Sequence, residues 1–214
     1  SAYYNSNVGY YLQLKELGIP IMMLNARYDE IPAPTVTLND YQAGYDVTEY
    51  LINHGHTKIG GIFKIDDKQG KERLRGYIQA CYDYGVEYNS DVVVVYETET
   101  LRDLLDTSVK KIIKNREVTG FVSYNDKVAI ELLNIIWQNG LSVPEDISLI
   151  SHDNSNLSTM TKVNLTGVNH PKSELGHEAA LRLINYLEGK IETIESKEFQ
   201  GEMIVRDSVR DINQ

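Results

Sequence analysis

The chain of 214 residues has 42% hydrophobic and 24% charged side chains, a composition typical of a globular domain with a core of its own. Its formal net charge of -10 argues against direct contact with nucleic acid, because phosphate binding needs clustered Lys and Arg. No apolar run approaches the roughly 20 residues that cross a bilayer. A single cysteine, Cys81, excludes an internal disulfide and favours a reducing, cytoplasmic environment.

Short apolar runs alternate with segments of helical periodicity along the chain. Helices are predicted at 10–17, 43–55, 74–81, 101–113, 129–140 and 175–187, and strands at 21–24, 58–63, 92–95, 121–124, 147–150 and 203–205. This alternation is typical of βαβ units and predicts an α/β fold, with parallel sheets covered by helices on both faces.

Polar residues follow the last residue of several predicted strands. They are Asn25, Lys64, the run Tyr124-Asn125-Asp126, and Asp153. In open parallel sheets, ligands bind at the carboxyl ends of the strands, beside a topological switch point. The sequence therefore predicts a polar binding site at this edge.

Six short motifs resemble those of the effector domain of LacI/GalR regulators. They are GHTKI at 55–59, RLRGY at 73–77, YND at 124–126 with Ala129, VPEDIS at 143–148, the loop through Asp153, and PKSELG at 171–176. Each motif alone is weak, but their order and spacing hold from about residue 39 to residue 208, which is most of the chain. The resemblance implies a two-lobed, periplasmic-binding-protein-like fold.

Three segments look closest to the arabinose repressors of Gram-positive bacteria: NVGYY at 7–11, GIFKIDD at 61–67 and NHPKS at 169–173. In that branch a GntR-type winged helix precedes a LacI-type sugar domain. The resemblance implies a monosaccharide effector, L-arabinose first, and no cofactor. It also implies a homodimer in the intact protein, no membrane partner, and operator contact only through an N-terminal domain outside this chain.

The resemblance also implies a division of the chain into lobes. Residues 1–38 and 169–190 are expected in a remnant of the N-terminal lobe, because family members have further βα units upstream. Residues 39–168 and 191–214 are expected in the C-terminal lobe. The connections between the lobes are expected near 38–39, 167–169 and 190–197.

Eight residues are expected to bind the sugar. Arg73 matches the arginine three residues before the glycine of the family's RxxG helix, Asp153 matches the effector-binding aspartate, and Asn125 belongs to the family's ND pair, with Asp126 as helix N-cap. The other five are Asn25, Lys64, Gln69, Tyr124 and His170. Planar Arg, Asp and Asn groups suit neighbouring hydroxyls, each of which is both donor and acceptor.

Plainer interpretations stand beside these. Arg73 fits a helix-surface pair with Glu72 or Asp66, Asp153 fits an Asx turn with Ser155, and His170 fits packing between lobes. No GxSxG, P-loop or HExxH motif occurs, and the consecutive carboxylates Asp66-Asp67 point in different directions. No catalytic residue or metal ligand is therefore expected. A sugar-binding protein of a transport system, with the same fold, stays open as the alternative.

Overall fold

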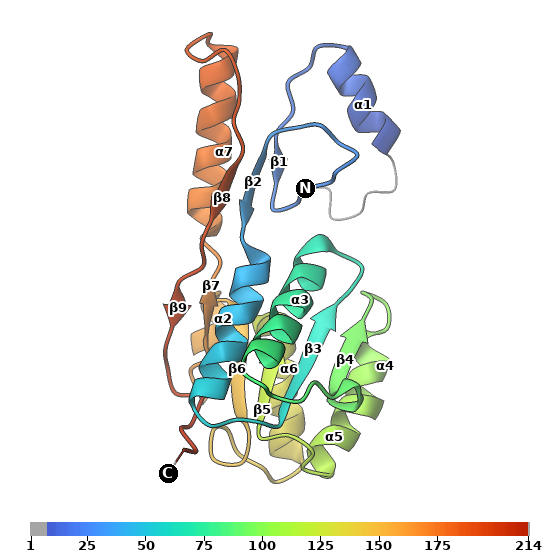
Figure 1. Cartoon of the computed structure of the whole chain (residues 1–214), viewed down its shortest axis with the longest axis vertical. Coiled ribbons are helices and arrows are strands. Elements are labelled where there is room, and N and C mark those ends of the chain that lie inside the picture. Colours follow the sequence, from blue (N-terminus) through green and yellow to red (C-terminus); the bar gives the residue numbers. More distant parts are fainter. Residues whose placement is uncertain (1–7, 214) are drawn as a thin grey trace.

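The computed structural model describes residues 8–213 and arranges them around two sheets that lie one above the other along the long axis (Figure 1). The smaller sheet has the strand order β1-β2-β8, with all neighbours parallel. Its elements are β1 (Met23–Leu24), β2 (Thr35–Leu38) and β8 (Lys197–Phe199), accompanied by α1 (Val8–Glu16) and α7 (Lys172–Leu187).

The larger sheet has the order β4-β3-β5-β6-β7-β9, and only the last pair, β7 with β9, is antiparallel. Its strands are β3 (Ile59–Lys64), β4 (Val93–Tyr96), β5 (Gly120–Ser123), β6 (Ser148–Asp153), β7 (Thr166–Asn169) and β9 (Met203–Ile204). Short 3-10 turns, η1 (Ser90–Val92) and η3 (Asn156–Thr159), flank β4 and β6. The parallel α/β fold expected from the alternation of elements is confirmed.

Helices cover both faces of the larger sheet and bury a separate core on each. The pair α2 (Asp40–Asn53) and α3 (Lys68–Asp83) packs on one face, where Phe63, Val122 and Ile150 are buried. The other face buries Ile62, Phe121 and Leu149 under a second layer. This layer comprises α4 (Leu101–Leu104), the π-helical turn η2 (Leu105–Val109), α5 (Lys110–Lys114) and α6 (Asp126–Gln138). Successive strand residues thus point to opposite cores, as the period of two requires.

The three connections between the sheets run through one narrow region (Figure 1). They join β2 to α2, β7 to α7 and β8 to β9, at residues 38–40, 169–172 and 199–203. The predicted third connection at 190–197 is wrong, and so is the assignment of all of 191–214 to the second lobe. Because β8 pairs in parallel with β2, the chain leaves the smaller sheet only after Phe199.

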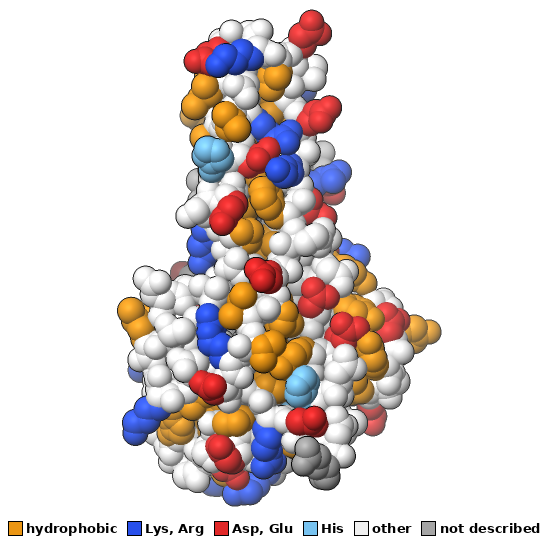
Figure 2. Space-filling view, turned by 90° about the vertical axis from the view of Figure 1, so that its left-hand side faces the viewer, with side chains coloured by type: hydrophobic (Ala, Val, Ile, Leu, Met, Phe, Trp, Pro, Cys, Tyr) orange, Lys and Arg blue, Asp and Glu red, His pale blue; other side chains and the backbone are white. Residues whose placement is uncertain are grey.

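The smaller sheet is thinly covered. Both core clusters belong to the larger sheet, and Leu175 is the only residue of α7 that is buried. Seen from the side of α7, hydrophobic side chains are exposed along the narrow upper part among acidic and basic ones (Figure 2). Within 8–213, no helix is long and apolar enough to span a membrane.

Two glycines let α2 and α3 approach backbone to backbone. A Cβ at Gly44 would lie 2.2 Å from the carbonyl oxygen of Arg73, and one at Gly76 would lie 2.0 Å from that of Tyr41. No L side chain fits such gaps. The glycine of the RxxG motif therefore holds the helix that bears Arg73 against the helix that begins at Asp40.

We expect Gly76→Ala to lower the free energy of unfolding by about 1–3 kcal/mol or more, because the methyl group would force the helices apart. Gly176→Ala is the matched control, since a Cβ at that position in α7 meets nothing within 4 Å. It should stabilise the fold by about 0.5–1 kcal/mol through helix propensity. Urea unfolding of both variants checks this, and equal effects would contradict the close helix contact.

Candidate ligand-binding site

Arg73 lies in the interior where α3 meets the strand ends, with 2% of its side chain exposed. Its Nε donates to Asp40 Oδ1 at 2.9 Å, its Nη2 forms an ion pair with the same oxygen at 2.8 Å, and its Nη1 donates to the Tyr124 carbonyl oxygen at 2.6 Å. The guanidinium also lies 5.2 Å from the centre of the Tyr124 ring. A surface pair with Glu72 is excluded, because Glu72 accepts from Arg75 instead.

Asp153 is the last residue of β6, and its carboxylate is partly open, with 22% of the side chain exposed. Three nitrogens surround it: Arg73 Nη2 at 3.5 Å, His170 Nδ1 at 3.8 Å and Lys172 Nζ at 3.9 Å. Its φ of 94° is in the left-handed region, which costs a non-glycine residue conformational energy. Such strain persists where the surrounding structure fixes the backbone, and it is frequent at binding sites.

His170 joins the two sheets, because its Nε2 lies 3.1 Å from Oδ1 of Asn25, the residue after β1. Burial, and then the charge of Arg73, lower the pKa of His170 below its ordinary value, against the opposing effect of Asp153. The imidazole is therefore neutral near pH 7, and its Nε2–H donates to the amide oxygen. Asn25 also has a positive φ, of 60°.

Lys64 and Tyr124 converge on the carboxylates that follow β3. The Lys64 ammonium lies 3.2 Å from both Asp66 and Asp67, and the Tyr124 hydroxyl donates to Asp67 Oδ2 at 2.7 Å. The other oxygen of Asp67 caps α3 by accepting from Gly70 N–H. Asp67 thus joins Lys64 to Tyr124, and Tyr124 in turn contacts Arg73.

The assignment of Asp126 as the N-cap of α6 is wrong. Asn125 is the cap, and its Oδ1 accepts from Val128 N–H at 3.0 Å. Asp126 is buried one position later, where its carboxylate accepts from the hydroxyls of Ser151 and Ser155. Asn and Asp both serve as N-caps, so the pair Asn125-Asp126 does not by itself show which of the two residues caps the helix.

A polar cavity of about 410 Å3 lies between the sheets. Of the eight predicted residues, Asn25 and Gln69 line it, and Gln69 is buried with its Nε2 unpartnered among the described residues. Asp40 also lines the cavity, yet sequence reasoning did not single it out. Asp40 comes just after β2, a strand that was not predicted. The expectation that ligands bind at the carboxyl ends of strands therefore did not point to this residue.

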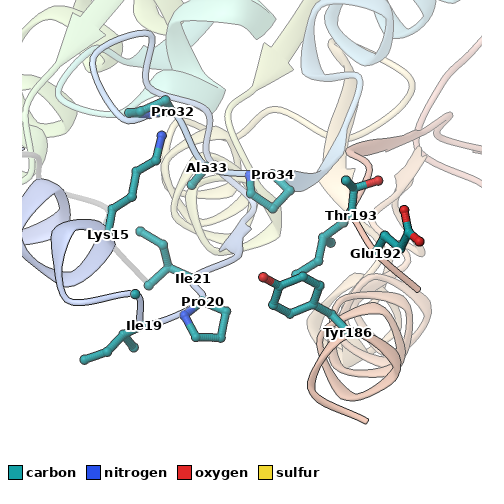
Figure 3. Close-up of a pocket in the computed structure, with 12 residues that line it drawn as sticks. Lys15, Ile19, Pro20, Ile21, Pro32, Ala33, Pro34, Tyr186, Glu192 and Thr193 are labelled. Atoms are coloured by element: carbon teal, nitrogen blue, oxygen red, sulfur yellow. The ribbon is translucent and has the colours of Figure 1, made fainter. Parts of the chain in front are cut away.

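A second cavity, of about 320 Å3, lies at the smaller sheet between the loop after α1 and the end of α7 (Figure 3). Pro20 lies opposite Tyr186 across it. None of the eight predicted site residues lines this cavity. Between residues 8 and 213, no cluster of three or more His, Cys, Asp or Glu side chains has the geometry to hold a metal ion.

Residues 48–209 match the family model of the periplasmic binding protein-like domain. The match covers most of the chain, and the two sheets with three connections have the matching architecture. The chain belongs to this family.

Within it, the chain is similar to transcription regulators. It is 42% identical to the arabinose metabolism transcriptional repressor of Geobacillus stearothermophilus, over 99% of this chain and 59% of that protein. The repressor of the same name from Halalkalibacterium halodurans is 39% identical, over 86% of this chain and 50% of the relative. The chain thus spans between half and three fifths of the curated relatives' length.

Solved structures agree with this. A sugar-binding transcriptional regulator of the LacI family from Escherichia coli has a TM-score of 0.81 at 26% identity, covering 96% of this chain and 74% of that one. The Escherichia coli transcriptional repressor ascG has a TM-score of 0.82 at 28% identity, covering 95% and 74%. The resemblance to LacI/GalR regulators is confirmed.

His152, the neighbour of Asp153, is buried, and we expect it to make the stability of the fold depend on pH. It is 1% exposed, its Nδ1 lies 2.9 Å from the Ser123 carbonyl oxygen, and its Nε2 is buried without a partner in the described part of the chain. Burial first, and then the charge of Arg73, lower the pKa of His152 to about 3. The folded protein therefore keeps this ring neutral at mildly acidic pH.

Because the unfolded chain protonates His152 near pH 6.5 and the folded chain does not, its contribution to stability is complete above that pH and is lost as pH falls. Each pH unit below 6.5 costs about 1.4 kcal/mol, or about 2 kcal/mol by pH 5. We expect His152→Phe to flatten the fall in unfolding free energy between pH 7 and pH 5. The exposed His177→Phe is the control, and parallel curves for wild type and His152→Phe would refute the assignment.

Proposed function

We propose that this chain is the effector-binding part of a bacterial transcription repressor, and that it binds a monosaccharide, first of all L-arabinose, between its two sheets. One observation carries the proposal. The partly exposed carboxylate of Asp153 is held by a buried arginine at the point where strand ends and connections meet. The names of the repressors from Geobacillus and Halalkalibacterium support arabinose as the sugar.

The chemistry of the cleft suits a neutral polyol. Asp153 would accept hydrogen bonds from neighbouring hydroxyls, while the amides of Asn25, Gln69 and Asn125 offer donors and acceptors. The cavity lined by Asn25 and Gln69, of about 410 Å3, falls within the roughly 300–1,000 Å3 of ordinary ligand pockets, and Asp153 lies outside its lining. Lys64, Tyr124 and His170 complete the proposed site.

Arg73 acts in this proposal mainly through the carboxylates that it holds. Its Nε and Nη2 are bound to Asp40, and its Nη1 to the Tyr124 carbonyl oxygen, so little of its fork is left for a sugar. A guanidinium stays charged at any physiological pH. It therefore holds Asp40 and Asp153 in place as hydrogen-bond acceptors.

In the whole repressor, operator DNA would be bound by an N-terminal domain outside this chain, in a cytoplasmic homodimer. Sugar would favour one arrangement of the two sheets and so change the spacing of the paired DNA-binding domains. The role is binding and not catalysis. Regulator names among the relatives favour a repressor over a transport protein.

Calorimetric titration of this chain with L-arabinose, beside D-xylose and D-galactose, tests the proposal. We expect saturable heat with arabinose and at least about tenfold weaker binding of the other two, because a misplaced hydroxyl leaves buried polar groups unpaired. Asp153→Asn should weaken arabinose binding by about tenfold or more, the loss of a charge-assisted hydrogen bond.

Asp103→Asn, an exposed carboxylate on α4, is the matched control and should bind as wild type does. The titration is repeated on a protein of the relatives' full length. Absence of saturable heat with all three sugars in both proteins would refute the proposed function. Equal affinities of Asp153→Asn and wild type would refute the assigned site.

A further inference from the structure

Arg206, two residues after β9, reaches the loop that follows Asp153. Its Nη2 donates to Asn154 Oδ1 at 2.6 Å, and its Nη1 donates to the Leu165 carbonyl oxygen at 2.7 Å and lies 3.4 Å from Ser158 Oγ. One guanidinium thus joins the beginning, middle and end of the 154–165 loop. Nothing in the proposed sugar site accounts for this arginine.

The backbone that Arg206 braces is strained. Asp153 and Asn154 have φ values of 94° and 45°, so two successive residues with side chains are in the left-handed region. Asp and Asn adopt this region more readily than other L-residues, but two in succession still need contacts that hold them there. The amide of Asn154 is held at both ends, because its Oδ1 accepts from Arg206 while its Nδ2 donates to Asn169 Oδ1 at 3.2 Å.

Arg206 is itself firmly anchored. The backbone N–H of Arg206 donates to Thr166 Oγ1 at 2.9 Å. The hydroxyl of Ser208, two residues later, accepts from the backbone N–H of Thr166 at 2.8 Å. Since Thr166 begins β7 of the larger sheet, the arginine projects from a fixed position. A fixed donor pair of this kind can orient a loop, whereas a mobile surface arginine cannot.

We propose that Arg206 is a positioning residue for the sugar site. By holding the Asn154 amide, it keeps Asp153 in its left-handed conformation, with the carboxylate aimed at Arg73 and the cleft. The inference deepens the proposed function and rests on it. Through Asn154, the site is also joined to two of the connections between the sheets. Arg206 follows the β8–β9 connection, and Asn169 begins the β7–α7 connection.

A double-mutant cycle tests this role against a general structural one. We expect Arg206→Gln to weaken L-arabinose binding about tenfold, which corresponds to about 1.4 kcal/mol. In an Asn154→Gly background, Arg206→Gln should change the affinity less than about twofold, because the amide that transmits the effect is gone and glycine accepts a positive φ. Arg210→Gln is the matched control, since Arg210 is exposed and its hydrogen bonds are made by its backbone.

Hydrogen exchange of the amides at 154–158, without sugar, gives an independent readout. Arg206→Gln should speed exchange there and leave the strands of the larger sheet protected. Should Arg206→Gln fail to fold, Arg206→Lys, which keeps the charge but loses the fork, takes its place in both measurements.

The outcomes separate the two proposals. Wild-type affinity in folded Arg206→Gln, or an equal loss in both backgrounds, overturns the positioning role while arabinose binding by wild type upholds the proposed function. Absence of sugar binding by wild type, both in this chain and in the protein of the relatives' full length, overturns both proposals, even where exchange in the loop shows that Arg206 holds it.

Discussion

The buried ion pair between Arg73 and Asp40 is the contact on which the rest of the site depends. A charge inside a protein must be paired, and removing one partner of such a pair typically costs about 3–5 kcal/mol. Arg73 is on α3 and Asp40 is the first residue of α2, directly after the β2 connection. The pair can form because Gly44 and Gly76 let the two helices meet backbone to backbone. Helix packing, the connection between the sheets and the site are thus fixed together.

The same guanidinium serves two carboxylates unequally. Asp40 is buried and 2.8 Å away, whereas Asp153 is partly exposed and 3.5 Å away, so Asp153 is the one with capacity left for a ligand. With Lys172 also near Asp153, the charges of the site largely compensate one another. An anionic or cationic ligand would upset this balance and would need a counter-charge of its own. A neutral polyol asks only for donors and acceptors, which is the physical argument for a sugar.

Much of this was predictable from the sequence, for reasons that particular residues make clear. The run 147–150 is mostly apolar (Ile147, Leu149 and Ile150) and is buried on both faces, so its composition predicted a strand. The strands β2 (TVTL), β7 (TGVN) and β8 (KEF) were missed, since they are short, partly polar and defined by their partners. Because β2 was not predicted, Asp40, which follows it, was not recognised as a site residue. Motifs marked Arg73, Asp153 and His170, but no motif shows that Asp40, and not a ligand, occupies the fork of Arg73, because that depends on how closely two helices pack.

The positions of these groups decide what a ligand can do. Asp40 follows the first connection between the sheets, His170 lies in the second, and Arg206 comes after the third (Figure 1). Asp40 pairs with Arg73, which also pairs with Asp153. His170 lies beside Asp153 itself, and Arg206 donates to Asn154, the next residue. In the proposed function, a ligand bound at Asp153 would act where all three connections converge, and a small change there would rotate one sheet relative to the other. How far it shifts that equilibrium is limited by its difference in affinity for the two arrangements. Tight binding alone would not move the sheets; contacts made in one arrangement and lost in the other, such as the bond from His170 to Asn25 on the smaller sheet, would.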